Sequence, residues 1–340
     1  MISNHSNHVE PNRTNNDQKQ SLTTIHLIDF VSGSDYEAHN DLLLTMLIKN
    51  FRIRSLHSTT KLPFKFSAPF DVTISYNCGC ILVNDRGTQS IEVFDLITRQ
   101  HKSSLSVKNF FPHYLCIEEN YNGEGDDALL MGHLETTLLT SYCVCKVDLN
   151  TFLSTGNLSF PFLWQNKKFT REALGMCIVT NQNGDRELVV CDSGNCFLRV
   201  LDLTTGVQIK IIQCGFEPCH VCNVFNEELV ISYSFVKGAV KMKKANDSME
   251  FQLLCGDRST IDFYDAYSIA FDSYNNRFIV SDPSSEGKLK VYTCQGSLVN
   301  EFKSFMEMPK GLCFHKLTRE IFVCVQNSVI GYQFDSVFFK

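Results

Sequence analysis

The chain has 340 residues, is 44% hydrophobic and contains 27 Phe, which is enough apolar material to fill one large core or two ordinary ones. Its net charge of −6 and isoelectric point near 5.9 argue against nucleic-acid binding, which needs clustered Lys and Arg to neutralise phosphates. No apolar run approaches the roughly 20 residues that cross a bilayer. We therefore expect neither a nucleic-acid nor a membrane partner.

The N-terminal region is predicted to lie outside the main fold. Residues 1–22 are mostly Asn, Ser, His, Gln and Thr, and we expect a disordered tail because they bury almost nothing apolar. Residues 23–50 are predicted to be a helical segment, since Ser34 and Glu37 have the spacing of a capping box and apolar residues at helical spacing follow. No signal peptide is recognisable after Met1, which favours a cytoplasmic protein.

From residue 67 onward a short apolar phrase recurs six times. Its copies begin at Pro69, Pro112, Ala173, Pro218, Ala266 and Pro309. The starts are 43 to 61 residues apart. A period of this length is typical of stacked supersecondary units.

Each phrase is followed by further strand-like runs. In the first unit these are Ile81–Asp85, which is apolar on both faces, and Ile91–Asp95, which alternates between apolar and polar residues. A turn and a more polar fourth run complete the unit. Four-stranded antiparallel sheets that repeat radially form a β-propeller, so the sequence predicts an all-β, six-bladed β-propeller over residues 51–340.

The last repeat is short, which suggests how the ring closes. Blades are predicted to start near residues 67, 110, 171, 216, 264 and 307. After Ser328–Phe334 few residues remain for a fourth strand in the last blade. We expect residues 51–57 to supply it as an N-terminal closing strand that removes an exposed edge.

The 15 cysteines are expected to be reduced, because no export signal is visible. Four of them, Cys116, Cys177, Cys222 and Cys313, occupy the fifth position of the phrase, where a small apolar residue suits a core. The Cys219-His220-x-Cys222 cluster lacks a second metal-binding pair. We therefore predict no zinc site and no cofactor.

The repeated pattern resembles the NHL-repeat family over roughly residues 67–335. The likeness rests on the Pro-x-small-apolar phrase, on apolar runs that end in Asp, such as Val83–Asp85, and on Ile91–Asp95. The Asn-His pair that names the family is absent, and the even-numbered blades depart from the pattern. The resemblance implies a non-enzymatic scaffold that binds protein partners, with a substrate-recognition adaptor in ubiquitin-dependent turnover as one form of it.

An enzymatic function is the alternative. Propellers similar to gluconolactonases and amidating lyases hold a divalent cation at the mouth of the central channel, so a metal-dependent hydrolase or lyase with its site there remains open.

The candidate site residues follow from the predicted topology. The phrase begins the innermost strand, so its side chains are expected to ring the mouth of the central channel. Three Asp residues that end second strands are expected to cap the turns that follow them. Binding candidates are Asp71, His113, Tyr114, His220 and, in an insertion of the second blade, Trp164; the predicted turn caps are Asp85, Asp192 and Asp282; no catalytic or metal-binding residue is assigned.

Overall fold

The computed structural model describes residues 60–333 except for short internal gaps. The gaps are residues 108–109, 136–141, 159–160, 170–172, 182, 225–227, 234–239, 245–250, 256–265, 284–286 and 304–307. The predicted tail (1–22) and helical segment (23–50) fall outside the described residues. So does the range 51–57, where we expected the closing strand.

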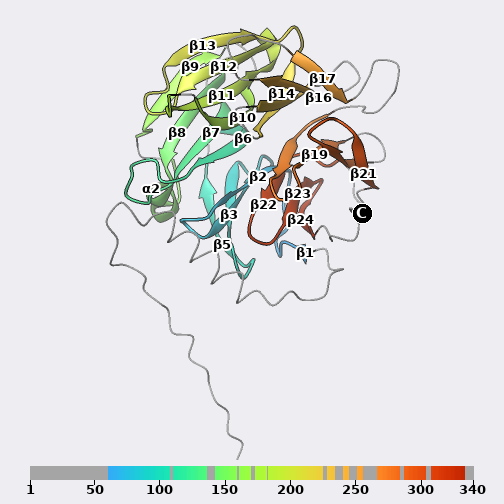
Figure 1. Ribbon diagram of the computed structural model, residues 1–340. Coiled ribbons are helices and arrows are strands. Elements are labelled where there is room, and N and C mark those ends of the chain that lie inside the picture. The colour runs from blue at the N-terminus through green and yellow to red at the C-terminus, as the bar shows by residue number, and fades with distance from the viewer. Residues whose placement is uncertain are drawn as a thin grey trace, which may run out of the picture. The chain divides into compact units, whose positions relative to one another are not determined.

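The described residues form six four-stranded antiparallel sheets (Figure 1). Five consist of consecutive strands, and the sixth has the order β1-β24-β23-β22. The strands are β1 (Thr60–Lys61), β2 (Pro69–Ser75), β3 (Cys80–Asp85), β4 (Ser90–Asp95), β5 (His101–Ser106), β6 (Phe110–Glu118), β7 (Ala128–Glu135), β8 (Tyr142–Asp148), β9 (Trp164–Phe169), β10 (Ala173–Thr180), β11 (Arg186–Asp192), β12 (Phe197–Asp202), β13 (Gln208–Gln213), β14 (Pro218–Asn223), β15 (Glu228–Tyr233), β16 (Val240–Lys244), β17 (Phe251–Cys255), β18 (Ile269–Asp272), β19 (Arg277–Asp282), β20 (Lys288–Thr293), β21 (Leu298–Lys303), β22 (Leu312–His315), β23 (Glu320–Val325) and β24 (Ser328–Gln333).

The strand that holds each copy of the phrase is the innermost strand of its sheet. These strands contact one another in a closed cycle, β2 with β6, then β10, β14, β18, β22 and back to β2. In Figure 1 the labelled inner strands gather near the centre of the view. The prediction of an all-β propeller is therefore confirmed.

An N-terminal strand completes the sheet that holds the last strands of the chain. In β1, Thr60 lies opposite Gly331 and Lys61 opposite Ile330 of β24. The next residues fix this pairing, because Leu62 is only 2% exposed and donates its N–H to a carbonyl at the start of β24. The pairing strand thus lies a few residues after the predicted range.

The core consists of apolar layers between neighbouring sheets. All six positions of β3 are buried, as expected for a strand covered on both faces. Leu82 of β3 and Leu129 of β7 lie in one such layer, and Leu130 of β7 and Leu188 of β11 lie in the next.

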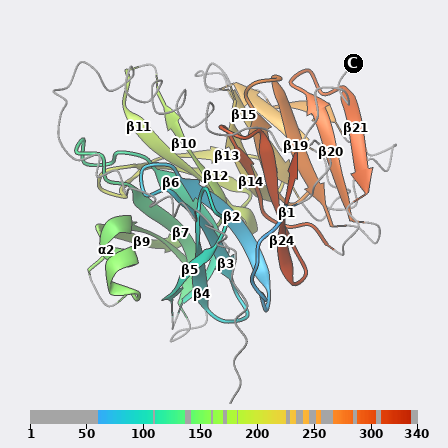
Figure 2. The same cartoon turned by 90° about the horizontal axis from the view of Figure 1, so that it is seen from below.

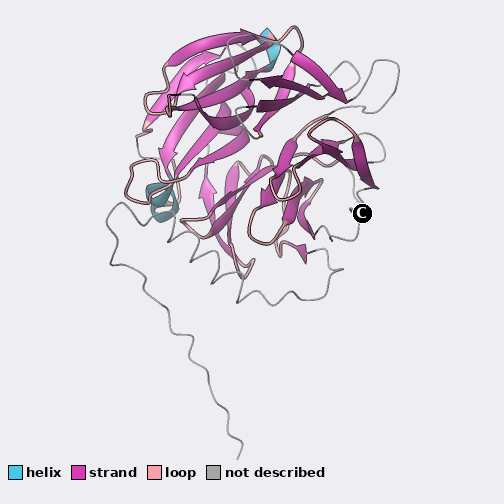
Figure 3. Cartoon of the chain, in the orientation of Figure 1, coloured by secondary structure: helices cyan, strands magenta, loops and turns pink. Residues whose placement is uncertain are grey.

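The described part of the chain contains two short helices (Figure 3), α2 (Leu149–Thr155) and the single-turn η1 (Ser193–Asn195). Helix α2, which the sequence did not predict, follows β8 and contacts β7; Figure 2 shows it beside β7 and β9. Asp148 caps it by accepting the Thr151 N–H at 2.6 Å, and Gly156 ends it in the left-handed conformation. Within the described residues, no helix is long and apolar enough to cross a membrane.

Candidate functional site at the channel mouth

The recurring phrase introduces a β-bulge into the inner strands. The register shifts between Pro69 and Asp71 in β2 and between Pro218 and His220 in β14. A bulge re-aims a side chain relative to the regular alternation of a strand. Here it directs the third residue of the phrase toward the inner strand of the next sheet.

Three of these third residues bridge neighbouring sheets. Asp71 Oδ2 accepts the backbone N–H of Leu115 at 2.8 Å, and His220 Nδ1 accepts that of Ile269 at 3.3 Å. Ser268 Oγ makes the same contact, at 3.2 Å, with the first residue of β22. These bonds satisfy N–H groups on inner edges that have no further strand to pair with. Asp71 and His220 therefore each hold a different neighbouring strand.

Glycine makes room for two of the bridges. A Cβ atom added to Gly311 would lie 2.5 Å from Asp71 Cα, and one added to Gly175 would lie 2.6 Å from His220 Cα. A side chain at either glycine would force the inner strands apart. The third position of the phrase therefore holds Gly in the two copies that pack against Asp71 and His220.

The fifth-position cysteines also belong to this inner ring. Burial raises the pKa of Cys116 to about 12, and a hydrogen bond from the backbone of Ile178 in the next sheet opposes that rise. Cys177 has the same environment: burial raises its pKa well above the ordinary value, and the backbone of Asn223 hydrogen-bonds to it. The described cysteines are free thiols, and among the described residues no group of three or more His, Cys, Asp or Glu is placed to hold a metal ion.

Tyr114 fills the channel below the mouth. It is fully buried, and its hydroxyl donates to the carbonyl of Tyr267 at 3.5 Å and lies 3.8 Å from Cys219 Sγ. Its ring centroid is 5.4 Å from that of Phe70 and 5.1 Å from that of His220. Aromatic side chains of three inner strands thus pack against one another where the strands converge.

Burial shifts the pKa of both ionisable bridges in the direction that favours the uncharged form. Burial raises the pKa of Asp71 to about 7, although hydrogen bonds from the backbone of Leu115 and Val72 oppose the rise. Burial lowers the pKa of His220 to about 4, which suits its role as an acceptor through Nδ1. Neither group is a free ligand in this arrangement.

The layer above Tyr114 gathers two cationic side chains around Phe70. The Arg86 guanidinium carbon lies 4.6 Å from the Phe70 ring centroid, and Lys310 Nζ lies 5.4 Å from it. Both side chains are partly exposed, whereas Phe70 is only 4% exposed. His113, whose ring centroid is 5.8 Å from that of Phe70, completes the group that we call the channel mouth.

Two buried polar atoms at the mouth have no hydrogen-bond partner among the described residues. They are Nδ1 of His113 and Oδ1 of Asn84. The Asn84 amide group donates to the carbonyls of Pro112 and His113 at 2.6 and 3.0 Å, which places the two side chains on adjoining segments. Burial, followed by the positive charge of Arg86, lowers the pKa of His113 to about 3, so the imidazole is neutral.

The three predicted turn caps behave differently. Asp85 accepts the backbone N–H groups of Ser67 and Ala68, both at 2.7 Å, and thereby fixes the entry to β2. Asp192 contacts Arg199 Nε at 2.5 Å and also accepts from the side-chain amide of Asn195, in the turn after β11, at 2.9 and 3.0 Å. Asp282 lies 3.5 Å from the Lys290 ammonium. A basic residue on the following strand thus reaches each carboxylate, and turn capping by these two residues stays a prediction.

Trp164 was predicted as a binding candidate in an insertion of the second blade, and in the structure it is a buried residue of a strand. It begins the outer strand β9, is 8% exposed, and donates its indole N–H to the Leu203 carbonyl at 3.0 Å. The ring packs against Gly206, where an added Cβ would lie 2.4 Å from a ring carbon. The indole therefore joins the second sheet to the third.

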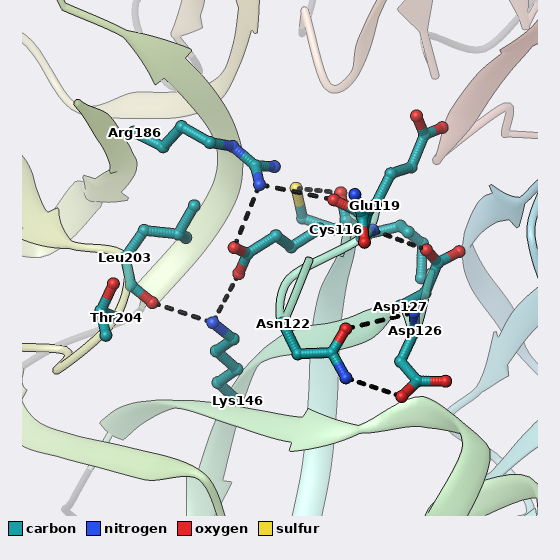
Figure 4. A network of polar contacts seen from close by, with 12 residues as sticks. Cys116, Glu119, Asn122, Asp126, Asp127, Lys146, Arg186, Leu203 and Thr204 are labelled. Carbon is teal, nitrogen blue, oxygen red and sulfur yellow. Dashed lines mark hydrogen bonds and ion pairs between the residues drawn. The ribbon is translucent and has the colours of Figure 1, made fainter. Parts of the chain in front are cut away.

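A polar network stabilises the enlarged second unit (Figure 4). Glu118 pairs with Lys146 at 2.6 Å and with Arg186 at 3.3 Å. Asn122 donates to Asp126 at 2.7 Å within the insertion loop. The acidic groups of this loop thus hold the loop and its neighbours together.

Comparison with known proteins identifies the fold. No family model matches the chain, and no curated protein matches it in sequence. Two solved propellers are similar in structure. Regucalcin from Agrobacterium tumefaciens strain C58, a calcium-binding protein, has a TM-score of 0.57 at 8% identity, covering 81% of this chain and 93% of its own. A luciferin-regenerating enzyme has a TM-score of 0.60 at 9% identity, covering 82% and 96%.

These comparisons correct the functional expectation. The NHL resemblance led us to expect a non-enzymatic scaffold or ubiquitin adaptor, but no NHL family model matches, and the similar propellers are a calcium-binding protein and an enzyme. The phrase common to the repeats reflects packing of the inner strands, and many propellers share that requirement. The resemblance therefore indicated the fold, and the comparisons do not favour the scaffold function that it implied.

Sequence reasoning also missed part of the channel mouth. It named His113 but not Phe70, Arg86, Lys310 or Asn84, because the repeat drew attention to its third position. The second position holds Phe70, His113 and Lys310 in different copies of the phrase. The variation of residue type at the second position could have indicated a functional role, since a position that varies between copies has no shared packing role.

Proposed function

We propose that this protein is a hydrolase or lyase that acts on a small molecule bound at the channel mouth. The observation that carries this proposal is the buried His113 imidazole, whose Nδ1 has no partner among the described residues and whose ring neighbours Phe70, the side chain that the partly exposed cations Arg86 and Lys310 also contact. The similarity to a propeller enzyme and a calcium-binding propeller supports an enzymatic rather than a scaffolding role.

The group combines two features that hydrolysis and elimination both need. A neutral imidazole accepts a proton, either from an attacking water or from a carbon next to a carbonyl. Arg86 and Lys310 stabilise the negative charge that develops on the substrate oxygen. His113 then returns the proton to the leaving group, so that it ends the cycle neutral.

A resident calcium ion in the channel does not fit the donor set. Calcium takes six to eight oxygen ligands. At this level Asp71 is a carboxylate that already binds a backbone N–H, and His220 offers a nitrogen that does the same. The unbalanced charges of Arg86 and Lys310 would repel a cation above them. We therefore assign no step to a metal, and in this respect the proposal departs from the metal-dependent alternative.

A substrate panel tests the proposal. The purified full chain is assayed with lactones and carboxylic esters for hydrolysis and with hydroxy acids for elimination, with and without a chelator. We expect chelator-insensitive turnover of at least one class, and a loss of at least about 100-fold in kcat for His113→Ala. Lys210→Ala, at an exposed position of the outer strand β13, serves as the control. The absence of turnover with every class, or equal activity of His113→Ala, would overturn the proposal.

A further inference from the structure

The channel mouth carries two positive charges that no described acidic side chain balances. Arg86 and Lys310 both face the Phe70 ring, at 4.6 and 5.4 Å from its centroid, and neither forms an ion pair with a described residue. Burial, followed by the charge of Arg86, lowers the pKa of Lys310, so each cation raises the free-energy cost of the other. In a protein of net charge −6, two neighbouring cations without an acidic partner indicate a binding role.

The nearest carboxylates along the chain are already engaged. Asp85 directly precedes Arg86, and its two oxygens accept three backbone N–H groups, those of Ser67, Ala68 and Gly87. Asp71 directly follows Phe70, but it is 2% exposed and holds the inner strand of the next sheet. The positive charge therefore remains available to a ligand.

The two buried polar atoms without hydrogen-bond partners limit the chemical groups that the ligand can carry. Asn84 Oδ1 is a hydrogen-bond acceptor, so it requires a donor such as a hydroxyl group. His113 Nδ1, in a side chain that is 5% exposed, accepts or donates according to its tautomer. Both atoms are closed to solvent in this structure, so a ligand reaches them only when neighbouring side chains move, and a ligand that then satisfies them together with the cations combines negative charge with at least one hydroxyl.

We propose that the ligand of the channel mouth is a compact, hydroxyl-bearing dianion, either a phosphate or a dicarboxylate, held by Arg86 and Lys310 and hydrogen-bonded by Asn84 and His113. The two cations match a charge of −2, and the planar guanidinium suits the paired oxygens of either group. This inference rests on the proposed function for the place of the ligand, and it adds the substrate class.

Binding of the dianion would also change His113. Burial is the main cause of its lowered pKa, and the positive charge of Arg86 adds to it. A bound anion offsets that charge and moves the pKa of the imidazole back toward its ordinary value, where it is a better base. Substrate binding would in this way prepare the proton acceptor.

Calorimetric titration of the full chain with defined probes, at constant ionic strength, tests the inference. The probes are inorganic phosphate, malate, succinate, which lacks the hydroxyl, and glycerol as an uncharged control. We expect phosphate or malate to bind, succinate to bind more weakly than malate, and glycerol not to bind. The phosphate and malate arms distinguish the two sources of the dianion.

Variants locate the site. Arg86→Ala and Lys310→Ala should each weaken binding roughly tenfold or more, and Arg86→Lys should weaken it less. Lys210→Ala, which removes an exposed charge from the outer strand β13, should leave binding unchanged. Melting temperatures of the unliganded variants report whether each one folds.

The outcomes separate this inference from the proposed function. Absence of binding by every anion, or binding unaffected by Arg86→Ala and Lys310→Ala, overturns the dianion. Turnover of an uncharged substrate that depends on His113 would leave the enzyme proposal standing without the dianion. Arg86-dependent anion binding with no turnover of any class would support the dianion and overturn the enzyme.

Discussion

Substitution of Asp71 by Asn should stabilise the protein at neutral pH and not in acid. The change removes the ionisable proton and keeps a carbonyl oxygen that can accept the Leu115 N–H, now 2.8 Å from Asp71 Oδ2. Burial raises the pKa of Asp71 from 3.8 to about 7. Between these two values the folded protein keeps a proton that the unfolded chain has released, so the wild-type protein loses stability as the pH rises.

The size of the effect follows from the pKa change. The stability difference between Asp71→Asn and the wild type should grow by about 1.4 kcal/mol for each pH unit between 4.5 and 7. It should level off above pH 7, with a total of about 4 kcal/mol as an upper bound. Burial lowers the pKa of His113, His220 and His315, which favours folding at higher pH, but these groups are common to both proteins and cancel in the difference.

Urea unfolding at pH 5, 6, 7 and 8 measures this difference, with the fluorescence of Trp164, the single Trp of the chain, as the signal. Asp71→Leu is the companion variant: it removes the charge and the acceptor together, and the orphaned Leu115 N–H should make it about 1–3 kcal/mol less stable than Asp71→Asn at every pH. A stability difference between Asp71→Asn and the wild type that stays constant from pH 5 to 8 would refute the reasoning.

Three further substitutions test the packing. Gly206→Ala should lower the melting temperature strongly, because its φ is +70° and the new Cβ would meet the Trp164 ring at 2.4 Å; an unchanged melting temperature would contradict this contact. Tyr114→Ala should cost about 3–5 kcal/mol of unfolding free energy, because it leaves a cavity where the ring packs. Tyr114→Phe loses only long hydrogen bonds of 3.5 and 3.8 Å and should cost less than about 1 kcal/mol. Equal losses in urea titrations would show that the ring does not provide the packing. A chain that begins at Ser67 lacks β1 and should melt well below the full chain in a calorimetric scan, and an equal melting temperature would rule out closure by β1.

The propeller was predictable because its pattern repeats. The phrase at Pro69 and its copies pack in the same way. The run Ile81–Asp85 is apolar on both faces, which predicts a buried central strand. Strand bounds at the closing segment were less predictable, because β1 has only two residues and nothing in Thr60–Lys61 distinguishes it from a loop.

The candidate site was only partly predictable, because local sequence does not reveal a neighbour from another sheet. Asp71 and His220 were correctly placed on inner strands, but their hydrogen bonds to the following sheet depend on the bulge and on ring closure. Trp164 lies in a segment that reads as an insertion loop, and its burial follows from the contact with Gly206, 42 residues later. Arg86 and Lys310 meet only because the last sheet of the chain closes against the first.

A crystal structure of the full chain, grown with whichever of phosphate and malate binds in solution, tests the central claim most directly. We predict that anion next to Phe70, with its oxygens within hydrogen-bond distance of Arg86 and Lys310. A cation coordinated by Asp71 and His220, or a mouth without the anion at concentrations that saturate binding in solution, would contradict it.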